Sequence, residues 1–312
     1  MDNKLLMRLF KLPSQSGCED DMISLVCKEL DAIGIEYEVD SIGNIFNISQ
    51  SGKPLLSAHL DTVQEKDDVK MADFIRMKEG YIKGNGIIGG DDKCGVYIIL
   101  YLLSQGDEFN FVFSVQEETG GQGINQFTLS NRFDNIPYGL VLDRKGNTDV
   151  ICTKNEYGIE EFENVLLEIG GVFGYTKAIG TWSDADIISD YISCANISVG
   201  YYNAHTVDEY VSLNDLQKSV DFVHNIIKNV IDFFDAPNKS NYVNYSKALS
   251  DKTCDLCNRD SYKTHVLETV FGITVCDECL RSIQWEVNSI VENERTTLDA
   301  FDDEYYGSGF YG

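Results

Sequence analysis

Short apolar runs that end in a histidine or an acid recur along this sequence, and they limit the folds open to it. The runs and the residues that follow them are 53–58 with His59, 109–115 with Glu117 and Glu118, and 138–142 with Asp143. Such runs are typical of strands buried inside an α/β sheet. Ligand sites of open α/β sheets lie beyond the carboxyl ends of the strands. The pattern therefore predicts an α/β sheet with a polar site at one edge.

The acidic pair after residues 109–115 carries the clearest chemical signal. Glu117 and Glu118 are adjacent and lead into a glycine-rich turn. Two neighbouring carboxylates repel each other unless a cation neutralises one of them or one holds a proton. We interpret Glu118 as a metal ligand and Glu117 as a general base beside it. On this stretch alone, a surface turn with two solvated acids is the simpler explanation.

His59 and Asp61 are two residues apart at the end of a predicted strand. On an extended backbone, side chains at this spacing point to the same side. Asp61 can then orient His59, while His59 offers a neutral nitrogen to a metal. The alternative is a histidine at a strand end followed by an acid that caps the next turn, and in isolation it fits equally well.

Two further candidate ligands lie in loops. Asp91 belongs to the segment 89–95 that leads into the apolar run 96–103, and His205 follows the predicted strand 195–200. Acids are also favoured at helix N-termini by the helix dipole, so Asp91 alone decides little. Together the five candidate ligands are two histidines and three carboxylates. This set suits a pair of zinc ions that share a bridging acid.

These motifs, in this order, resemble the co-catalytic di-zinc exopeptidases, a group that includes peptidase T, the bacterial leucyl aminopeptidases and related amidohydrolases. The similar segments cover most of residues 5–235 and are 13–19, His59-x-Asp61, Gly90-Asp91-Asp92, Glu117-Glu118-Thr119-Gly120, Asp143 and His205. The resemblance implies an α/β fold, a three-layer α/β/α sandwich with a mixed central sheet. It also implies a cis peptide bond between Asp91 and Asp92.

The resemblance further implies a role for each candidate residue. Asp91 would bridge two catalytic zinc ions, and the harder ligands would also tolerate cobalt or manganese. The other metal ligands would be His59 and Asp143 at one ion, and Glu118 and His205 at the other. Asp61 would support His59, and Glu117 would be the catalytic base.

The interval between Asp143 and Asp184 is short for this group. Many relatives insert a lid or dimerisation domain there, whereas this sequence has room for about one strand and one helix. Groups that relatives supply from such a lid must then come from elsewhere or be missing. Arg144 and Lys145 are candidates for binding a substrate carboxylate, and a solvated turn is the alternative for each. Residues 181–185 resemble a loop that lies near the substrate in relatives.

A separate metal site is predicted near the C-terminus. Beyond a polar linker, residues 241–253, two Cys-x-x-Cys pairs are separated by 18 residues, and they are Cys254 with Cys257 and Cys276 with Cys279. Four thiolates at this spacing indicate one structural zinc ion. The module, residues 254–292, resembles the zinc-binding module of the Clp protease unfoldase, which implies a protein partner or self-association. The catalytic domain would be residues 1–240, and residues 293–312 an acidic disordered tail.

Composition restricts the partners and the location. The net charge of -26 opposes contact with phosphate backbones, so no nucleic-acid partner is expected. No apolar run reaches the roughly 18 residues of a membrane span, and residues 1–12 lack the apolar core of a signal peptide. Nine cysteines suit reduced thiols and thiolate zinc ligands. We therefore expect a cytoplasmic protein without a membrane partner.

The functional prediction is a zinc-dependent exopeptidase, an aminopeptidase that hydrolyses short peptides through a metal-bound hydroxide with Glu117 as the general base. The choice of aminopeptidase rests on its frequency in the group and on the missing lid. An N-acyl amino-acid deacylase would use the same residues. A protein of another class, an inactive peptidase scaffold that recruits a partner through the zinc module, is expected to lack a ligand or the base, and the sequence retains them all.

Overall fold

The computed structural model of this chain describes residues 1–65, 69–131, 133–237, 266–268 and 274–276. The chain divides into two compact units, Met1–Lys239 and Ser240–Gly312. In the second unit, β13 (Val266–Glu268) pairs antiparallel with β14 (Thr274–Cys276). Of the four predicted thiolate ligands, Cys276 is the last residue of β14, and Cys254, Cys257 and Cys279 lie outside the described residues. The predicted linker and acidic tail lie outside them too.

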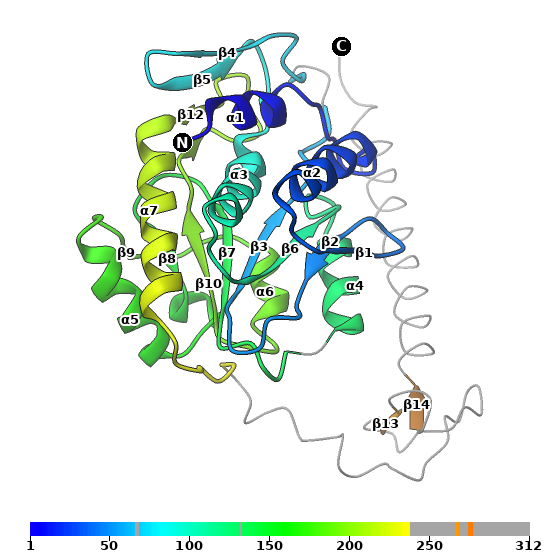
Figure 1. Cartoon of the computed structure of the whole chain (residues 1–312), viewed down its shortest axis with the longest axis vertical. Helices are drawn as coiled ribbons and strands as arrows, with labels where there is room; N and C mark the ends of the chain where they lie inside the picture. The colour runs from blue at the N-terminus through cyan, green and yellow to red at the C-terminus, as the bar shows by residue number, and fades with distance from the viewer. Residues whose placement is uncertain (66–68, 132, 238–265, 269–273, 277–312) are drawn as a thin grey trace, which may run out of the picture. The chain divides into compact units, whose positions relative to one another are not determined.

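An eight-stranded mixed sheet forms the centre of the first unit (Figure 1). Its strands, in spatial order, are β1 (Glu38–Val39), β2 (Ile45–Asn47), β6 (Asn110–Ser114), β3 (Leu55–His59), β7 (Gly139–Arg144), β10 (Cys194–Ser198), β8 (Asp149–Ile151) and β9 (Thr176–Lys177). The four central strands β6, β3, β7 and β10 run parallel, and β2 and β8 flank them in the antiparallel direction. The predicted mixed sheet is confirmed.

The central strands are apolar because both faces of the sheet are covered. Every residue of β3, β6 and β10 is buried. In β6 the rings of Phe111 and Phe113 are fully buried, and a side chain of this size contributes about 1.5–3 kcal/mol when it leaves water. The parallel register pairs His59 with Ser114, so β3 and β6 end level with each other. Polar residues that follow these strands therefore meet at one edge.

Helices complete a three-layer sandwich around this sheet. They are α1 (Asn3–Phe10), α2 (Asp20–Ile33), α3 (Gly90–Ser104), α4 (Gln122–Ser130), α5 (Glu160–Gly171), α6 (Asp184–Ile188) and α7 (Leu213–Asn229). Helices α1, α2, α3, α5 and α7 pack into one hydrophobic core, and α4 and α6 into a second core on the opposite face. Figure 1 shows α2, α3 and α7 in front of the strands. The predicted three-layer fold is confirmed.

A second, smaller sheet stands beside the main one and joins segments far apart in the sequence. Its antiparallel strands, in order, are β11 (Tyr201–Tyr202), β12 (Tyr210–Ser212), β5 (Tyr81–Gly84) and β4 (Ile75–Lys78). Val211 pairs with Ile82 across the β12–β5 contact. Because β5 shortly precedes Asp91 and the β11–β12 connection contains His205, this pairing brings two loops with candidate ligands together.

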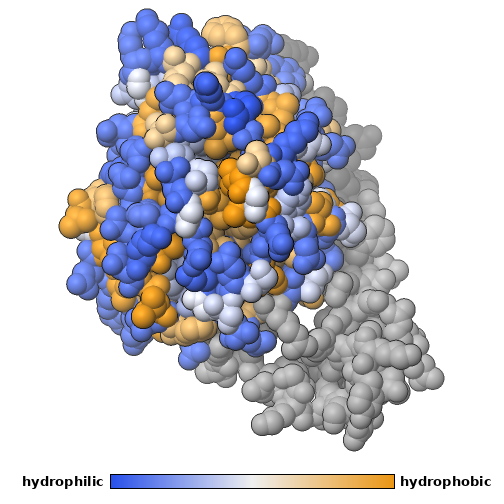
Figure 2. Space-filling model, in the orientation of Figure 1, coloured by the Kyte–Doolittle hydropathy of each residue, from blue (hydrophilic) through white to orange (hydrophobic). Residues whose placement is uncertain are grey.

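The interval after β7 adds to the sandwich itself. Between β7 and α6 the chain forms β8, a 3-10 turn at Thr153–Asn155, α5 and β9, which is one strand more than expected. Both strands extend the central sheet, and α5 packs into the first core. On the face shown in Figure 2, hydrophilic residues surround a central group of hydrophobic ones. Within the described residues, no helix is both long and apolar enough to span a membrane.

Candidate active site

The candidate ligands from the main sheet lie at the carboxyl ends of its parallel strands. His59 is the last residue of β3, and Asp143 is the last but one of β7. Strand β6 ends at Ser114, so Glu117 and Glu118 lie in the turn that follows it and not at the strand end itself. This turn closes tightly, because the N–H groups of two following glycines both donate to the Glu117 carbonyl at 2.9 Å.

The loops supply the other two candidates. Asp91 lies at the start of α3, where its backbone and that of Asp92 are not helical, and the peptide bond between them is cis, as expected from the resemblance. His205 lies in the β11–β12 connection with a positive φ of 63°. Its Nε2 is 3.3 Å from Asp91 Oδ2 and 2.7 Å from Glu118 Oε1.

Among the described residues, three overlapping groups of side chains could hold a metal ion: one is His59, Glu117 and Glu118, and the other two, the clusters considered below, contain only the five predicted ligands. The ligand atoms of His59, Asp91 and Asp143 all lie within 4.8 Å of one another, as do those of Asp91, Glu118 and His205. Asp91 belongs to both clusters. The structure therefore brings together the five residues singled out in the sequence and places the expected bridging acid between the two histidines.

His59 is held in the orientation that a ligand at Nε2 requires. Its Nδ1 is 2.9 Å from the Asp61 carbonyl and 3.3 Å from Asp61 Oδ1, so the Nδ1–H donates toward Asp61. The opposite nitrogen, Nε2, faces Asp91 Oδ1 at 3.2 Å and Asp143 Oδ1 at 3.6 Å, so in the neutral ring its lone pair would point at a metal ion held by these carboxylates. A hydrogen bond to one ring nitrogen fixes which nitrogen is available to a metal.

Asp61 organises more of the site than His59 alone. Its two carboxylate oxygens accept the N–H groups of Glu117 at 2.9 Å and Glu118 at 3.1 Å, and the Ser16 hydroxyl donates to Oδ2 at 2.6 Å. Burial alone would raise the pKa of Asp61, but His59, Ser16 and the Glu117 N–H hold it below its usual value. Asp61 is therefore a buried carboxylate that orients His59 and fixes the acidic turn.

The carboxylates of the site oppose one another strongly. Burial raises the pKa of Glu117 to about 10; the His59 charge lowers it, and nearby acids, first Asp143, raise it again. Burial and then the Asp91 charge likewise raise the pKa of Asp143 well above its usual value. A cation between these groups would stabilise their charged forms, because an opposite charge within about 4–6 Å favours ionisation.

The contact between His205 and Glu118 tests whether the donors fit a metal ion. The two ligand atoms are 2.7 Å apart, yet Glu118 Oε1 is buried and has no hydrogen-bond partner within the described part of the chain. The nitrogen and the oxygen are thus in close contact as an ion pair, and Asp91 and then this contact raise the pKa of His205. With a neutral imidazole ring, both atoms could direct a lone pair at one ion placed between them. Imidazole nitrogen and carboxylate oxygen are the donors of open zinc sites, so these residues fit zinc.

The structure adds a residue that sequence reasoning missed, the buried acid Glu209. Its Oε2 accepts the N–H groups of Ile88 at 2.7 Å and Gly89 at 2.9 Å, and its Oε1 accepts those of Gly90 at 2.7 Å and Asp91 at 3.4 Å. Glu209 therefore holds the backbone that carries Asp91. A lone acid before a short strand gives no signal of this role in the sequence.

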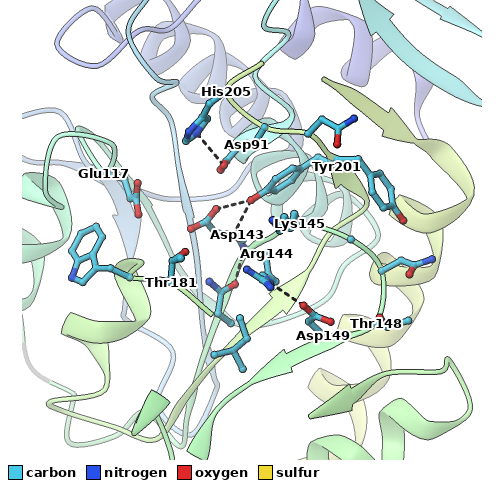
Figure 3. Close-up of a pocket in the computed structure, with 18 of the residues that line it drawn as sticks. Asp91, Glu117, Asp143, Arg144, Lys145, Thr148, Asp149, Thr181, Tyr201 and His205 are labelled. Atoms are coloured by element: carbon cyan, nitrogen blue, oxygen red, sulfur yellow. Dashed lines mark hydrogen bonds and ion pairs between the residues drawn. The ribbon is translucent and has the colours of Figure 1, made fainter. Parts of the chain in front are cut away.

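Two other residues near Asp143 were also missed. Asn196 Oδ1 accepts the Asp143 N–H at 3.3 Å. The Tyr201 hydroxyl donates to the Asp143 carbonyl at 3.2 Å, and Figure 3 shows the tyrosine beside Asp143. Burial raises the pKa of Tyr201 well above its usual value, so the hydroxyl stays a donor. Asn196 lies in β10 and Tyr201 in β11, directly after it. The sequence predicts only a strand in this region and gives no sign that either side chain supports the site.

A cavity of about 680 Å³ opens beside the candidate ligands (Figure 3). Acidic candidates Asp91, Glu117, Glu118 and Asp143 line it together with His205. Other walls come from residues 144–149, from Thr181 and Trp182 in the loop expected near the substrate, and from 201–204. Pockets for small ligands are typically about 300–1,000 Å³, so the volume suits a ligand of a few residues.

The chain is an α/β/α sandwich with a cluster of histidines and carboxylates at the carboxyl ends of the parallel strands. Several proteins of known structure share this fold. No family model matches the sequence, and no curated protein does. Aminopeptidase PepT of Bacillus cereus superposes with a TM-score of 0.58 at 17% identity, over 72% of this chain and 96% of that one. A tripeptidase of Staphylococcus aureus gives 0.59 at 16% identity, over 73% and 97%.

The TET1 peptidase of Pyrococcus horikoshii, which can assemble into a tetrahedron or a large octahedral shell, gives a TM-score of 0.57 at 17% identity. The match covers 73% of this chain and 99% of that one. At such identities the similarity establishes the fold, and the chain has the fold of these peptidases. Activity has to be argued from the site.

Proposed function

We propose that this protein is a zinc-dependent aminopeptidase that hydrolyses short peptides. The observation that carries the proposal is the pair of ligand clusters that share Asp91, with Glu117 on the wall of the adjoining cavity. The names of the proteins with the same fold, an aminopeptidase, a tripeptidase and a peptidase, support the same class of reaction.

The candidate ligands divide between two ions in this proposal. His59 and Asp143 would hold one zinc ion, Glu118 and His205 the other, and Asp91 both. When bound, the ions supply Lewis acidity, which polarises the scissile carbonyl and lowers the pKa of a water molecule. Asp61 keeps His59 Nε2 directed at the site through the contact at Nδ1. Cobalt or manganese could replace zinc at these nitrogen and oxygen donors.

Glu117 is the proposed general base. Its carboxyl group is buried and lines the cavity, and none of its oxygens is used in a hydrogen bond within the described residues. It takes a proton from the attacking water and returns it to the nitrogen of the leaving amine. The turn that carries it is fixed at the backbone by Asp61, which keeps the carboxylate in place during both transfers.

The proposal is tested with full-length protein loaded with zinc and assayed on two matched sets of substrates. One set is short peptides with a free amino terminus, and the other is the same peptides and single amino acids with an N-acetyl group. We expect release of the N-terminal residue from the first set only. Cleavage of only the acetylated set would instead establish the deacylase, which uses the same residues. Absence of hydrolysis in both sets, with the metal shown to be bound, would refute an enzymatic function of either kind.

The C-terminal module remains a prediction about partners. If its four cysteines bind a structural zinc ion, as their spacing indicates, residues 254–292 would present a surface for another protein or for a second copy of this chain. Pull-down experiments with the full chain and with a variant lacking residues 251–312 would identify such a partner.

A further inference from the structure

Two cations stand on the cavity wall beside the acidic cluster. They are Arg144, the last residue of β7, and Lys145, which follows it. Apart from these two, the charged residues of the wall are acids, and the wall also contains His205, Tyr201 and Tyr202. In a chain with 51 acidic and 25 basic residues, two adjacent cations in an otherwise acidic cavity require an explanation.

The guanidinium group of Arg144 is held in position by one hydrogen bond, and its other donors are available. Its Nε donates to Asp149 Oδ2 at 3.0 Å, and the side chain is 17% exposed. Its two terminal nitrogens make no hydrogen bond to any described residue. An arginine held by Nε on one side presents the outer edge of its planar guanidinium group, and this edge suits the two oxygens of a carboxylate.

Lys145 combines a fixed backbone with a free side chain. Its carbonyl accepts the Ser198 hydroxyl at 2.7 Å, and the N–H of the next residue, Gly146, donates to the Tyr201 carbonyl at 2.8 Å. Its ammonium group has no partner among the described residues, and the residue is exposed on the cavity wall. Figure 3 shows Lys145 and Arg144 on the same side of the pocket as Tyr201, across from Glu117.

We propose that Arg144 and Lys145 bind a carboxylate of the substrate and make the enzyme selective for short peptides that carry one near the scissile bond. The inference rests on the proposed function and deepens it. Arg144 directly follows Asp143, a proposed metal ligand, and consecutive Cα atoms are about 3.8 Å apart. A carboxylate bound here therefore belongs to a residue close to the bond held at the metal site. It is either the C-terminal carboxylate of a di- or tripeptide or an acidic side chain.

The experiment compares three zinc-loaded assays with the full-length protein. The substrates are a neutral tripeptide with a free C-terminus, its C-terminal amide, and an amidated tripeptide with one glutamate. We expect amidation to lower kcat/KM by about 10- to 100-fold, the range for a hydrogen bond to a charged group. Recovery of kcat/KM with the glutamate peptide would assign the subsite to acidic side chains, and no recovery would assign it to the C-terminus. Equal kcat/KM for all three substrates would overturn the proposal.

Variants assign the selectivity to the two residues. In Arg144→Gln/Lys145→Gln the difference between acid and amide should fall to about twofold or less, mainly through KM. The control is Arg76→Gln/Lys154→Gln, which makes the same change of charge at two exposed residues outside the cavity wall, and it should keep the full difference. A selectivity that survives in the first double variant would refute the role. Arg144→Lys, which keeps the charge but not the fork, should retain part of it.

A binding measurement separates this inference from the proposed function. Calorimetry with zinc-loaded Glu117→Gln protein should give at least tenfold tighter binding of the free-acid tripeptide than of its amide. The Arg144→Gln/Lys145→Gln changes in this background should remove that difference. If no peptide is hydrolysed but the difference in binding persists, the carboxylate subsite stands and the proposed activity fails. If hydrolysis occurs without any difference in binding, the activity stands and the subsite fails.

Discussion

Glu209 fixes the backbone at Asp91, from which it is separated by 118 positions in the sequence, by accepting the Gly90 N–H at 2.7 Å and the Asp91 N–H at 3.4 Å. In Glu209→Gln, an NH₂ group replaces one acceptor oxygen and leaves at least one buried N–H without a partner. The free energy of unfolding should fall by about 1–3 kcal/mol. Zinc affinity should fall by about 10- to 100-fold, as found for groups that support ligands.

Urea unfolding and zinc titration by calorimetry measure both effects. Glu168→Gln is the matched control, because Glu168 is exposed on α5 and should change neither quantity. If Glu209→Gln is less stable but binds zinc as the wild type does, Glu209 serves the fold and not the ligand loop.

Glu117→Gln tests the proposed base. The amide keeps the size of the side chain but cannot take a proton, so kcat should drop by about 10²- to 10⁴-fold. Zinc content, measured by atomic emission, should stay at the wild-type level, because Glu117 is not among the five proposed ligands. Near-normal turnover of this variant would remove Glu117 from the mechanism.

The two kinds of proposed metal site should respond differently to chelation. Four thiolates form a closed site, whereas the histidine–carboxylate pair keeps positions open to water and substrate. Fully loaded protein is expected to carry three metal ions per chain. Mild chelation should remove the two catalytic ions first and abolish hydrolysis, and added zinc or cobalt should restore it.

Substitution of Cys254 and Cys257 by serine should lower the metal count by one and spare most of the hydrolysis. The count is measured on the same preparation that is assayed. A wild-type total of one zinc ion, lost only when these cysteines are replaced, would show that the pair at His59 and His205 does not form.

Asp215, at the start of α7, should make stability depend on pH in the acid range. Asn147 Nδ2 donates to its Oδ1 at 2.7 Å, and the Tyr202 hydroxyl donates to its Oδ2 at 2.8 Å. Burial alone would raise the pKa of Asp215, but these hydrogen bonds and that of Ser212 hold it below its usual value. Its charge therefore stabilises the folded state above the unfolded pKa of about 3.9, and this contribution is lost as the pH falls through the lower folded pKa.

In Asp215→Asn the free energy of unfolding should be about 1–2 kcal/mol lower at pH 7, and the difference from the wild type should shrink below about pH 4. Urea unfolding of metal-free protein at several pH values checks this. Asp221→Asn, at an exposed position on the same helix, is the control. A difference that is equal at every pH would assign the effect to shape and not to charge.

The central strands are predicted well because each is buried on both faces, and its own residues are therefore mostly apolar. Residues 109–115 are mostly apolar, as is typical of a strand covered on both faces, and β6 occupies 110–114. The ends of the strands are harder to predict. Strand β6 ends at Ser114, where its hydrogen bonds in the sheet end, although the apolar residues continue to Val115, and Glu117 lies in the turn beyond. Asp91 and His205 are candidates from their places in loops, and only the order of motifs along the chain assigns each of them a role.

The remaining features could not be predicted because their partners are distant or are backbone groups. Glu209 binds four N–H groups, and backbone groups leave no trace in a sequence. The strands β5 and β12 are four and three residues long and pair across more than a hundred residues, so neither has a pattern of its own. Arg144 and Lys145 are candidates for carboxylate binding from the sequence, but a solvated turn accounts for them equally well there. Their position on the cavity wall is visible only in the structure.

The pairing of β5 with β12 also sets when the site can form during synthesis. His205 leaves the ribosome more than a hundred residues after Asp91, and at about 5–20 residues per second this delay is on the order of ten seconds. Until then the nascent chain carries a group of carboxylates without its second histidine and without the strand that holds the loop. Products of premature termination before residue 205 would therefore lack His205, one of the five proposed ligands, and the strand that pairs with β5.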